Sequence, residues 1–179
     1  SAHCSPSSSA CTAADPLGTQ HPDDRRSGSS PPPPSAAAVY VPSCTNRIFG
    51  PASESAIDPR IGGKALTRSV VDALVAVSAR AGRPVWIPDD VAGSCCGLPW
   101  SSKGFDAAHR HKANEMVERL WRWSGEGTLP IVIDASSCTG AIADPAEGVL
   151  SEVNAERLAG IEIVDSVAWA LRLLPDLTL

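Results

Sequence analysis

From about residue 37 onward, the hydrophobic residues of this chain alternate between two patterns. Short apolar runs, typical of buried strands, cover residues 37–43, 84–88, 130–135 and 161–164. Apolar residues at helical spacing cover residues 64–81, 105–123, 150–158 and 166–174. Strands that alternate with helices form parallel sheets covered on both faces. The pattern therefore predicts a Rossmann-like α/β fold of three layers, with a four-stranded parallel sheet and right-handed crossovers.

Residues 1–36 have a different composition. They are rich in Ser, Pro, Ala and Asp, end in a run of four prolines at residues 31–34, and contain few large apolar side chains. Such a segment cannot bury enough surface to offset the entropy lost on ordering. We expect a disordered linker over 1–36 and one α/β domain over 37–179. Because such linkers usually join two domains, and the first residue is Ser, we expect the chain to be part of a longer protein.

Charge and hydropathy narrow the classes of function. The net charge is −5, and no basic face is evident, which argues against a nucleic-acid partner. No apolar run approaches the ~18 residues of a membrane span, and no signal-peptide pattern is present. We expect a cytoplasmic, reducing location. There, cysteines are more often metal ligands or redox groups than disulfides.

Four of the six cysteines follow predicted strands. Cys44 comes directly after the first strand, Cys95 and Cys96 lie in the predicted loop after the second, and Cys138 lies in the predicted loop after the third. The carboxyl ends of parallel strands meet at one edge of a sheet, where ligands of α/β proteins bind. One cysteine alone is usually a small buried hydrophobe, but four at one edge predict a single metal-binding site.

Thiolates select zinc or iron–sulfur clusters, and four of them can complete either a zinc site or a four-iron cluster. Adjacent cysteines suit two irons of a cluster better than one tetrahedral ion, because successive side chains diverge. Glycines flank the thiols and let the backbone approach an inorganic core; they are Gly93, Gly97 and Gly140. The helix that begins near Phe105 is expected to point its positive end at this edge.

The segments around the thiols resemble a known family. These segments are residues 39–44 (VYVPSC), 94–104 (SCCGLPWSSKG) and 134–139 (DASSCT). They resemble the cysteine-rich CCG domain of heterodisulfide reductase subunits and of the iron–sulfur subunit of glycolate oxidase. The longer phrases, 85–105 and 129–138, look most like the C-terminal part of FAD-linked D-lactate dehydrogenases that carry ferredoxin-like modules. The resemblance covers about residues 38–177.

The resemblance implies an iron–sulfur electron-transfer module, with a 4Fe–4S type of cluster held by Cys44, Cys95, Cys96 and Cys138. The flavin chemistry of a D-lactate or glycolate type of dehydrogenase would occur on an FAD domain outside this chain. The partners would be that flavin domain and a ferredoxin-like domain, and a quinone acceptor would bring the protein to the periphery of the membrane. The full motif ends in Cys-x-x-Cys, whereas Ala141 stands three residues after Cys138. A five-thiolate cluster is therefore not expected.

Two other functions use the same thiols. In one, they hold a structural zinc ion in an interaction domain without redox activity. In the other, Cys95 and Cys96 act as a thiol–disulfide catalyst, although the usual pair is Cys-x-x-Cys.

Other polar and aromatic residues have structural explanations that we prefer. Asp89, Asp90 and Asp134 could support the ligands or transfer protons, but caps and turns explain them, and Asp165 fits an N-cap of the last helix. His109 and His111 do not share a helix face. Ser43, Ser136 and Ser137 could donate to sulfur, and Trp100 could shield a cluster from water. Residues 62–64 (GGK) could form a phosphate-binding loop, but the start of a helix explains them better. The tryptophans at 86, 121, 123 and 169 are expected in the core or at an interface.

Overall fold

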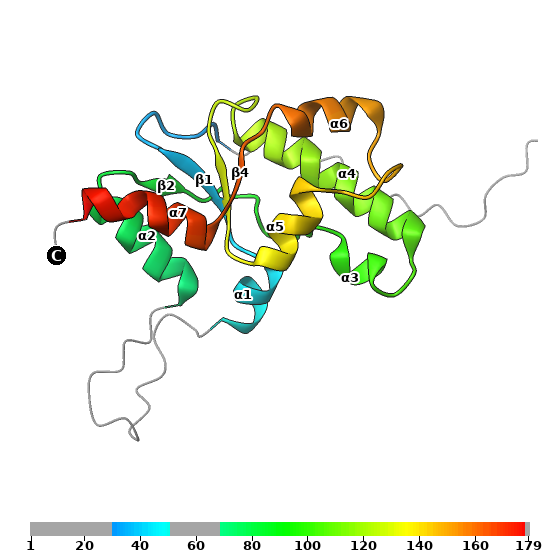
Figure 1. Ribbon diagram of the computed structural model, residues 1–179, viewed down its shortest axis with the longest axis horizontal. Coiled ribbons are helices and arrows are strands. Elements are labelled where there is room, and N and C mark those ends of the chain that lie inside the picture. The colour runs from blue at the N-terminus through cyan, green and yellow to red at the C-terminus, as the bar shows by residue number, and fades with distance from the viewer. Residues whose placement is uncertain (1–29, 51–68, 178–179) are drawn as a thin grey trace, which may run out of the picture.

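The structure is a computed structural model, which describes residues 30–50 and 69–177 (Figure 1). Most of the expected linker, Cys4, Cys11 and residues 62–64 lie outside these ranges. The strands are β1 Ala38–Val41, β2 Val85–Trp86, β3 Ile131–Ile133 and β4 Ile163–Asp165. The helices are α1 Cys44–Phe49, α2 Val70–Arg80, α3 Leu98–Ser101, α4 Asp106–Trp123, α5 Ser136–Ala143, α6 Glu152–Ala159, α7 Ser166–Leu173 and the 3₁₀ turn Leu174–Asp176.

The sheet has four strands, all parallel, in the order β2-β1-β3-β4. The predicted α/β fold is therefore confirmed, with each predicted strand in its place. The pattern missed α1, α3 and α5, because these helices have 6, 4 and 8 residues and little amphipathic repeat. The first part of the helix predicted over 64–81 lies outside the described residues.

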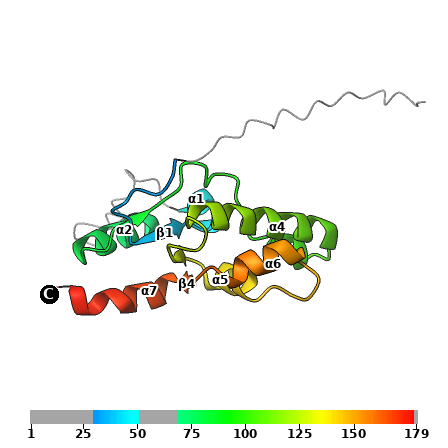
Figure 2. The ribbon, with the colours of Figure 1, turned by 90° about the horizontal axis from the view of Figure 1, so that it is seen from above.

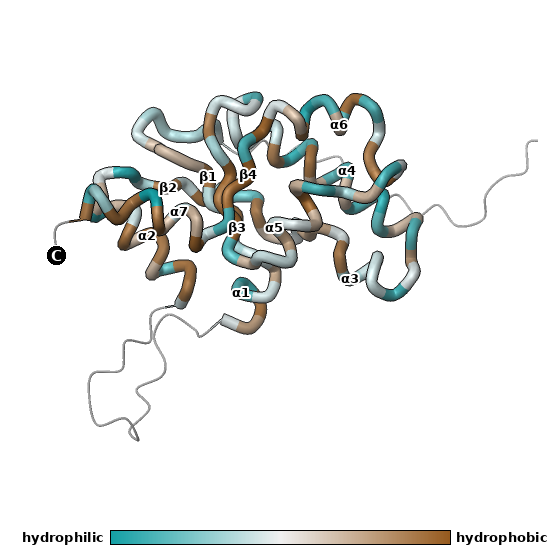
Figure 3. The backbone as a smooth tube through the Cα atoms, viewed as in Figure 1, coloured by the Kyte–Doolittle hydropathy of each residue, from teal (hydrophilic) through white to brown (hydrophobic). Residues whose placement is uncertain are grey.

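Helices cover both faces of the sheet, as Figures 1 and 2 show, with α2 and α7 at one side and α4 and α6 at the other. Alternate strand residues point to opposite faces. Val39, Val41 and Ile133 face the α4 side, where they pack with Leu120 and Trp123. The other face packs against α2 and α7 through Ala38, Tyr40, Val132, Val164, Trp169 and Leu173. The strands form the hydrophobic centre of the fold (Figure 3).

The strand order creates a switch point between β1 and β3. From β1 the chain crosses to β2 on one side, and it later returns past β1 to form β3 on the other side. Connections that leave neighbouring strands in opposite directions open a crevice at the carboxyl ends, which is where open α/β sheets bind ligands. Cys44 follows β1 and Cys138 follows β3, so two of the four thiols lie at this crevice.

None of the helices in the two described ranges has the length and the apolar character that crossing a bilayer requires.

Candidate metal centre

The four predicted cysteines lie around one cavity of about 20 Å³. Cys44 is the first residue of α1, Cys138 is the third residue of α5, and Cys95 and Cys96 lie in the loop that leads to α3. The prediction that Cys138 lies in a loop is therefore wrong, because α5 begins only three residues after β3 ends. The other lining residues are mainly apolar, and they include Val41, Met116, Ile133 and Ile142.

The first turn of α4, which was expected to point at this edge of the sheet, does not line the cavity. The α4 residue that lines it is Met116, in the third turn of the helix. The short helix α3 and the turn after it intervene between Cys96 and the start of α4. The first turn of α4 therefore does not line the cavity of the thiols.

Cys96 and Cys138 are in direct contact. Their Sγ atoms are 3.4 Å apart and share a hydrogen bond. Cys96 is only 6% exposed and packs into the core, whereas Cys44, Cys95 and Cys138 are half-buried. All four are free thiols. Within the described ranges, no three Cys, His, Asp or Glu side chains already have the spacing of a metal site.

The hydrogen bond between Cys96 and Cys138 shifts the pKa values of the two thiols in opposite directions. The hydrogen bond with Cys138, together with backbone N–H groups that include that of Leu98, lowers the pKa of Cys96 to about 6 despite its burial. The same hydrogen bond, followed by burial, raises the pKa of Cys138. Burial also raises the pKa of Cys95. Cys96 is therefore the more acidic of the two hydrogen-bonded thiols.

These shifts predict how the stability of the metal-free protein depends on pH. In the unfolded chain the Cys96 thiol keeps its proton up to about pH 9, since the ordinary pKa of a thiol is 9.0. In the folded protein Cys96 loses this proton above about pH 6, so between pH 6 and pH 9 the unfolded state binds more protons than the folded state. Stability should therefore rise over this range. Above pH 9 it should fall, because Cys95 and Cys138 keep protons that the unfolded chain loses. Urea unfolding of the wild type and of Cys96→Ala across pH 6–10 measures the difference, and no rise relative to the variant would contradict it.

Arg47 is a site residue that the sequence analysis missed. Its guanidinium lines the cavity and donates to three backbone carbonyls, those of Pro42 at 3.0 Å, Val91 at 2.8 Å and Ser94 at 2.6 Å. The bonds to Val91 and Ser94 tie α1 to the loop that carries Cys95 and Cys96. The side chain also places a positive charge at the wall of the cavity that the four thiols line. Arg47 lies outside any hydrophobic repeat, so the pattern gave no signal for it.

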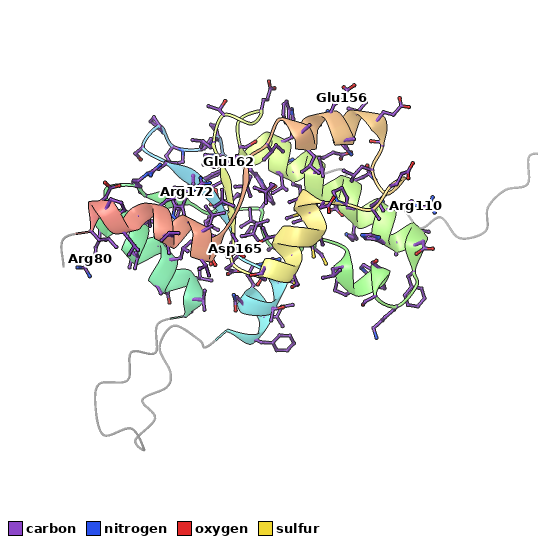
Figure 4. The ribbon with its side chains drawn as sticks, viewed as in Figure 1. Arg80, Arg110, Glu156, Glu162, Asp165 and Arg172 are labelled. Atoms are coloured by element: carbon purple, nitrogen blue, oxygen red, sulfur yellow. The ribbon has the colours of Figure 1, made fainter. Side chains whose placement is uncertain are left out.

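Replacing Arg47 by Met should weaken metal binding about 10- to 100-fold, the usual cost of losing a group that orients metal ligands. Arg80→Met is the matched control, because Arg80 is exposed and points away from the fold (Figure 4). Titration with a competing chelator measures the affinity. If Arg47→Met binds metal as tightly as Arg80→Met does, the guanidinium does not position the ligands.

Gly97, which follows the two cysteines, has two reasons to be glycine. Its φ is +83°, which L side chains rarely adopt, and a Cβ there would lie 2.9 Å from Cδ2 of His109. The absence of a side chain lets α4 approach the turn that carries Cys96. This contact also explains His109 as a packing residue, and His111 is exposed.

Gly97→Ala should lower the free energy of unfolding more than Gly93→Ala does. Gly93 has a similar φ of +78°, but a Cβ added there would meet no atom within 4 Å. The control should therefore lose only the cost of the left-handed conformation, about 1–2 kcal/mol. Gly97→Ala should lose about 1–3 kcal/mol more, through the overpacking against His109. Urea unfolding compares the two, and equal losses would show that the His109 contact yields at no cost.

The aspartates that follow strands act as structural ties. Asp134 accepts the Tyr40 hydroxyl at 2.6 Å and the Ser43 N–H at 2.7 Å, so it fixes the start of α1 against the end of β3. Burial and this carboxylate raise the pKa of Tyr40. Asp90 accepts the Trp123 indole N–H at 2.7 Å and pairs with Arg122, away from the thiols.

The last-helix cap was predicted correctly. Asp165 accepts the Val167 N–H at 2.8 Å and also the Ser136 hydroxyl at 2.8 Å, at the junction labelled in Figure 4. Ser136 therefore donates to a carboxylate, and the Ser43 hydroxyl accepts the Asn46 N–H as the cap of α1. Ser137 is exposed.

The aromatic residues do not surround the thiols. Trp100 is 42% exposed and packs edge-on against Phe105. It does not line the cavity, so the suggestion that Trp100 shields the thiols from water is not supported. Trp123 and Trp169 are fully buried, while Trp86 and Trp121 pack against the core cluster around Trp123. Trp123 and Trp169 are therefore core residues, whereas Trp121 keeps part of its surface exposed.

Comparisons with the models of protein families, with curated proteins and with solved structures found no match to this chain.

Proposed function

We propose that the four cysteines hold a thiolate-bound iron–sulfur cluster, and that the domain passes electrons as a module of an FAD-linked 2-hydroxyacid dehydrogenase. The observation that carries the proposal is the convergence of four thiols, from three strand–helix junctions, on one cavity at the switch point of the sheet. The choice of an iron–sulfur cluster comes from the resemblance of residues 94–104 and 134–139 to CCG domains.

The chemistry of the donor set fits such a group. The four thiols are the thiolate ligands among the lining residues, and the rest of the wall is mostly apolar apart from Ser43, Arg47 and Ser94. Soft thiolates in an apolar surround suit iron–sulfur clusters and zinc. The 20 Å³ cavity holds about one atom, so the half-buried Cys44, Cys95 and Cys138 must turn outward to hold a cluster.

A cluster would supply a one-electron carrier at this edge. The surrounding residues set the conditions for it. The guanidinium of Arg47 offsets part of the negative charge of the thiolates, and the apolar wall formed by Val41, Met116 and Ile133 keeps water from the inner side. The half-buried thiols lie on the open side, where an electron donor or acceptor could approach. These partners would be the flavin and ferredoxin-like domains of the same or another chain.

Zinc is the second candidate, and the sulfur spacing favours it. Two thiolates on one tetrahedral zinc ion lie about 3.8 Å apart, as follows from Zn–S bonds of about 2.3 Å. Cys96 and Cys138 are 3.4 Å apart, close to this value. In a cluster each thiolate binds its own iron, and the sulfurs stand farther apart. With zinc, the domain would serve interaction rather than redox chemistry.

The metal content separates the two candidates. We expect the full chain, purified without oxygen, to contain iron and acid-labile sulfide in near-equal amounts. It should also have a broad visible absorption that dithionite bleaches. Zinc at one ion per chain without sulfide would replace the first proposal by the second. A chain that takes up neither metal after reconstitution with iron and sulfide, or with zinc, would overturn both.

A further inference from the structure

Cys96 and Cys138 are arranged for a reaction with each other as well as for a metal. Their Sγ atoms are 3.4 Å apart, and both thiols are free. A disulfide needs an S–S distance of about 2.05 Å, so the sulfurs must approach by about 1.4 Å for the bond to form. The two residues come from different elements, the loop before α3 and helix α5, which allows each to adjust on its own.

We propose that Cys96 and Cys138 form a reversible disulfide when the metal-free domain meets a low-molecular-weight disulfide. This pair differs from the adjacent Cys95 and Cys96, because its two sulfurs come from separate elements and lie 3.4 Å apart. The inference does not depend on which metal the site prefers. It uses the same two sulfurs, however, so the disulfide and a bound metal exclude each other.

The reaction is two successive thiol–disulfide exchanges. Cys138 is the more exposed of the two, so a disulfide R–S–S–R from solvent reaches it first. Its sulfur attacks the reagent, its proton passes to the departing sulfur, and a mixed disulfide forms with release of one R–SH. The buried Cys96 thiolate then attacks the Cys138 sulfur, the bond to R breaks, and the second R–S⁻ leaves. The protein loses two electrons and two protons, and the reagent becomes two thiols.

The surroundings favour closure of this bond over a lasting mixed disulfide. Cys96 lies beneath Cys138 in the core, in contact with Met116 and Ile142 around the same cavity. Small adducts on Cys138 therefore stand within reach of the Cys96 sulfur. The other two thiols are expected to remain reduced.

The test uses the full chain carrying Cys4→Ser and Cys11→Ser, so that the four described thiols are the only ones present. The protein is freed of metal with a chelator, equilibrated with mixtures of reduced and oxidised glutathione, alkylated and mapped by mass spectrometry. We expect the alkylated thiols to fall from four to two, with a mass loss of two hydrogens and a cross-link between the peptides of residues 96 and 138. Reduction with dithiothreitol should restore all four.

Variants assign the bond, because Cys95 and Cys96 fall in one peptide. Cys95→Ser should keep the cross-link, whereas Cys96→Ser and Cys138→Ser should lose it. A cross-link that survives in Cys96→Ser but not in Cys95→Ser would overturn the proposal, as would four alkylated thiols or a stable glutathione adduct on Cys138. Repeating the oxidation on metal-loaded chain should block the cross-link. If the chain binds no metal, the proposed function fails while the disulfide result stands.

Discussion

Cys96→Ser is expected to remove the metal from the purified protein, with iron and sulfide, or zinc, falling at least about tenfold per chain. Cys96 is the innermost of the four thiols, and the core packs around it, so no other residue can move into its place. A serine oxygen is a poor ligand for the soft metals that thiolates select. Metal analysis after anaerobic purification, with far-UV circular dichroism as a check on folding, measures the effect.

The control for this experiment is the double variant Cys4→Ser, Cys11→Ser, whose thiols belong to the Ser/Pro-rich segment. It should keep the full metal content. Folded Cys96→Ser protein with unchanged metal would mean that the cavity of four cysteines is not the metal centre.

Trp169→Ala should cause the largest loss of stability, about 3–5 kcal/mol, as is usual when a large aromatic side chain is removed from a core. Trp169 on α7 is fully buried, and its indole N–H donates to the Ser78 hydroxyl of α2 at 2.9 Å. The change leaves a cavity between α2 and α7 and an unpartnered buried hydroxyl. Because small domains have only about 5–15 kcal/mol in total, a fraction of the variant should be unfolded at 37 °C.

Leu171→Ala is the matched control on the same helix. Leu171 is 67% exposed, so its loss should change the free energy of unfolding by no more than about 0.5 kcal/mol. Urea unfolding followed by circular dichroism compares the two in metal-free protein. A loss below 1 kcal/mol for Trp169→Ala would show that α7 contributes little to the fold. Metal content per folded chain should not change, because Trp169 packs on the face away from Met116.

The strands and the long helices could be predicted because each buries a run or a stripe of large apolar residues. The apolar run at residues 131–133 and the repeat along α4 are examples. The short helices could not be predicted, since capping and local hydrogen bonds decide them. α1 begins where the Ser43 hydroxyl accepts the Asn46 N–H and the Asp134 carboxylate accepts the Ser43 N–H. That helical start turns Cys44 toward the other thiols.

The meeting of the cysteines at one edge followed from parallel topology, but their fine arrangement did not. The sequence contains no sign of strand order, because the apolar runs are interchangeable, so the switch point between β1 and β3 appeared only in the structure. The contact between Cys96 and Cys138 depends on α5 and on the glycine turn at Gly97. Arg47 ties α1 to the loop that carries Cys95 and Cys96 by donating to the backbone carbonyls of Val91 and Ser94. Because every residue has a backbone carbonyl, no pattern of residue types predicts these bonds.

The strand order also determines when during synthesis the thiol site can exist. A ribosome releases Cys44, Cys95 and Cys96 well before Cys138, and the central pair β1–β3 joins segments that lie far apart in the chain. The nascent domain therefore exposes an incomplete set of ligands until β3 has docked beside β1. A cofactor-delivery protein would therefore meet its complete target only after β3 has docked beside β1.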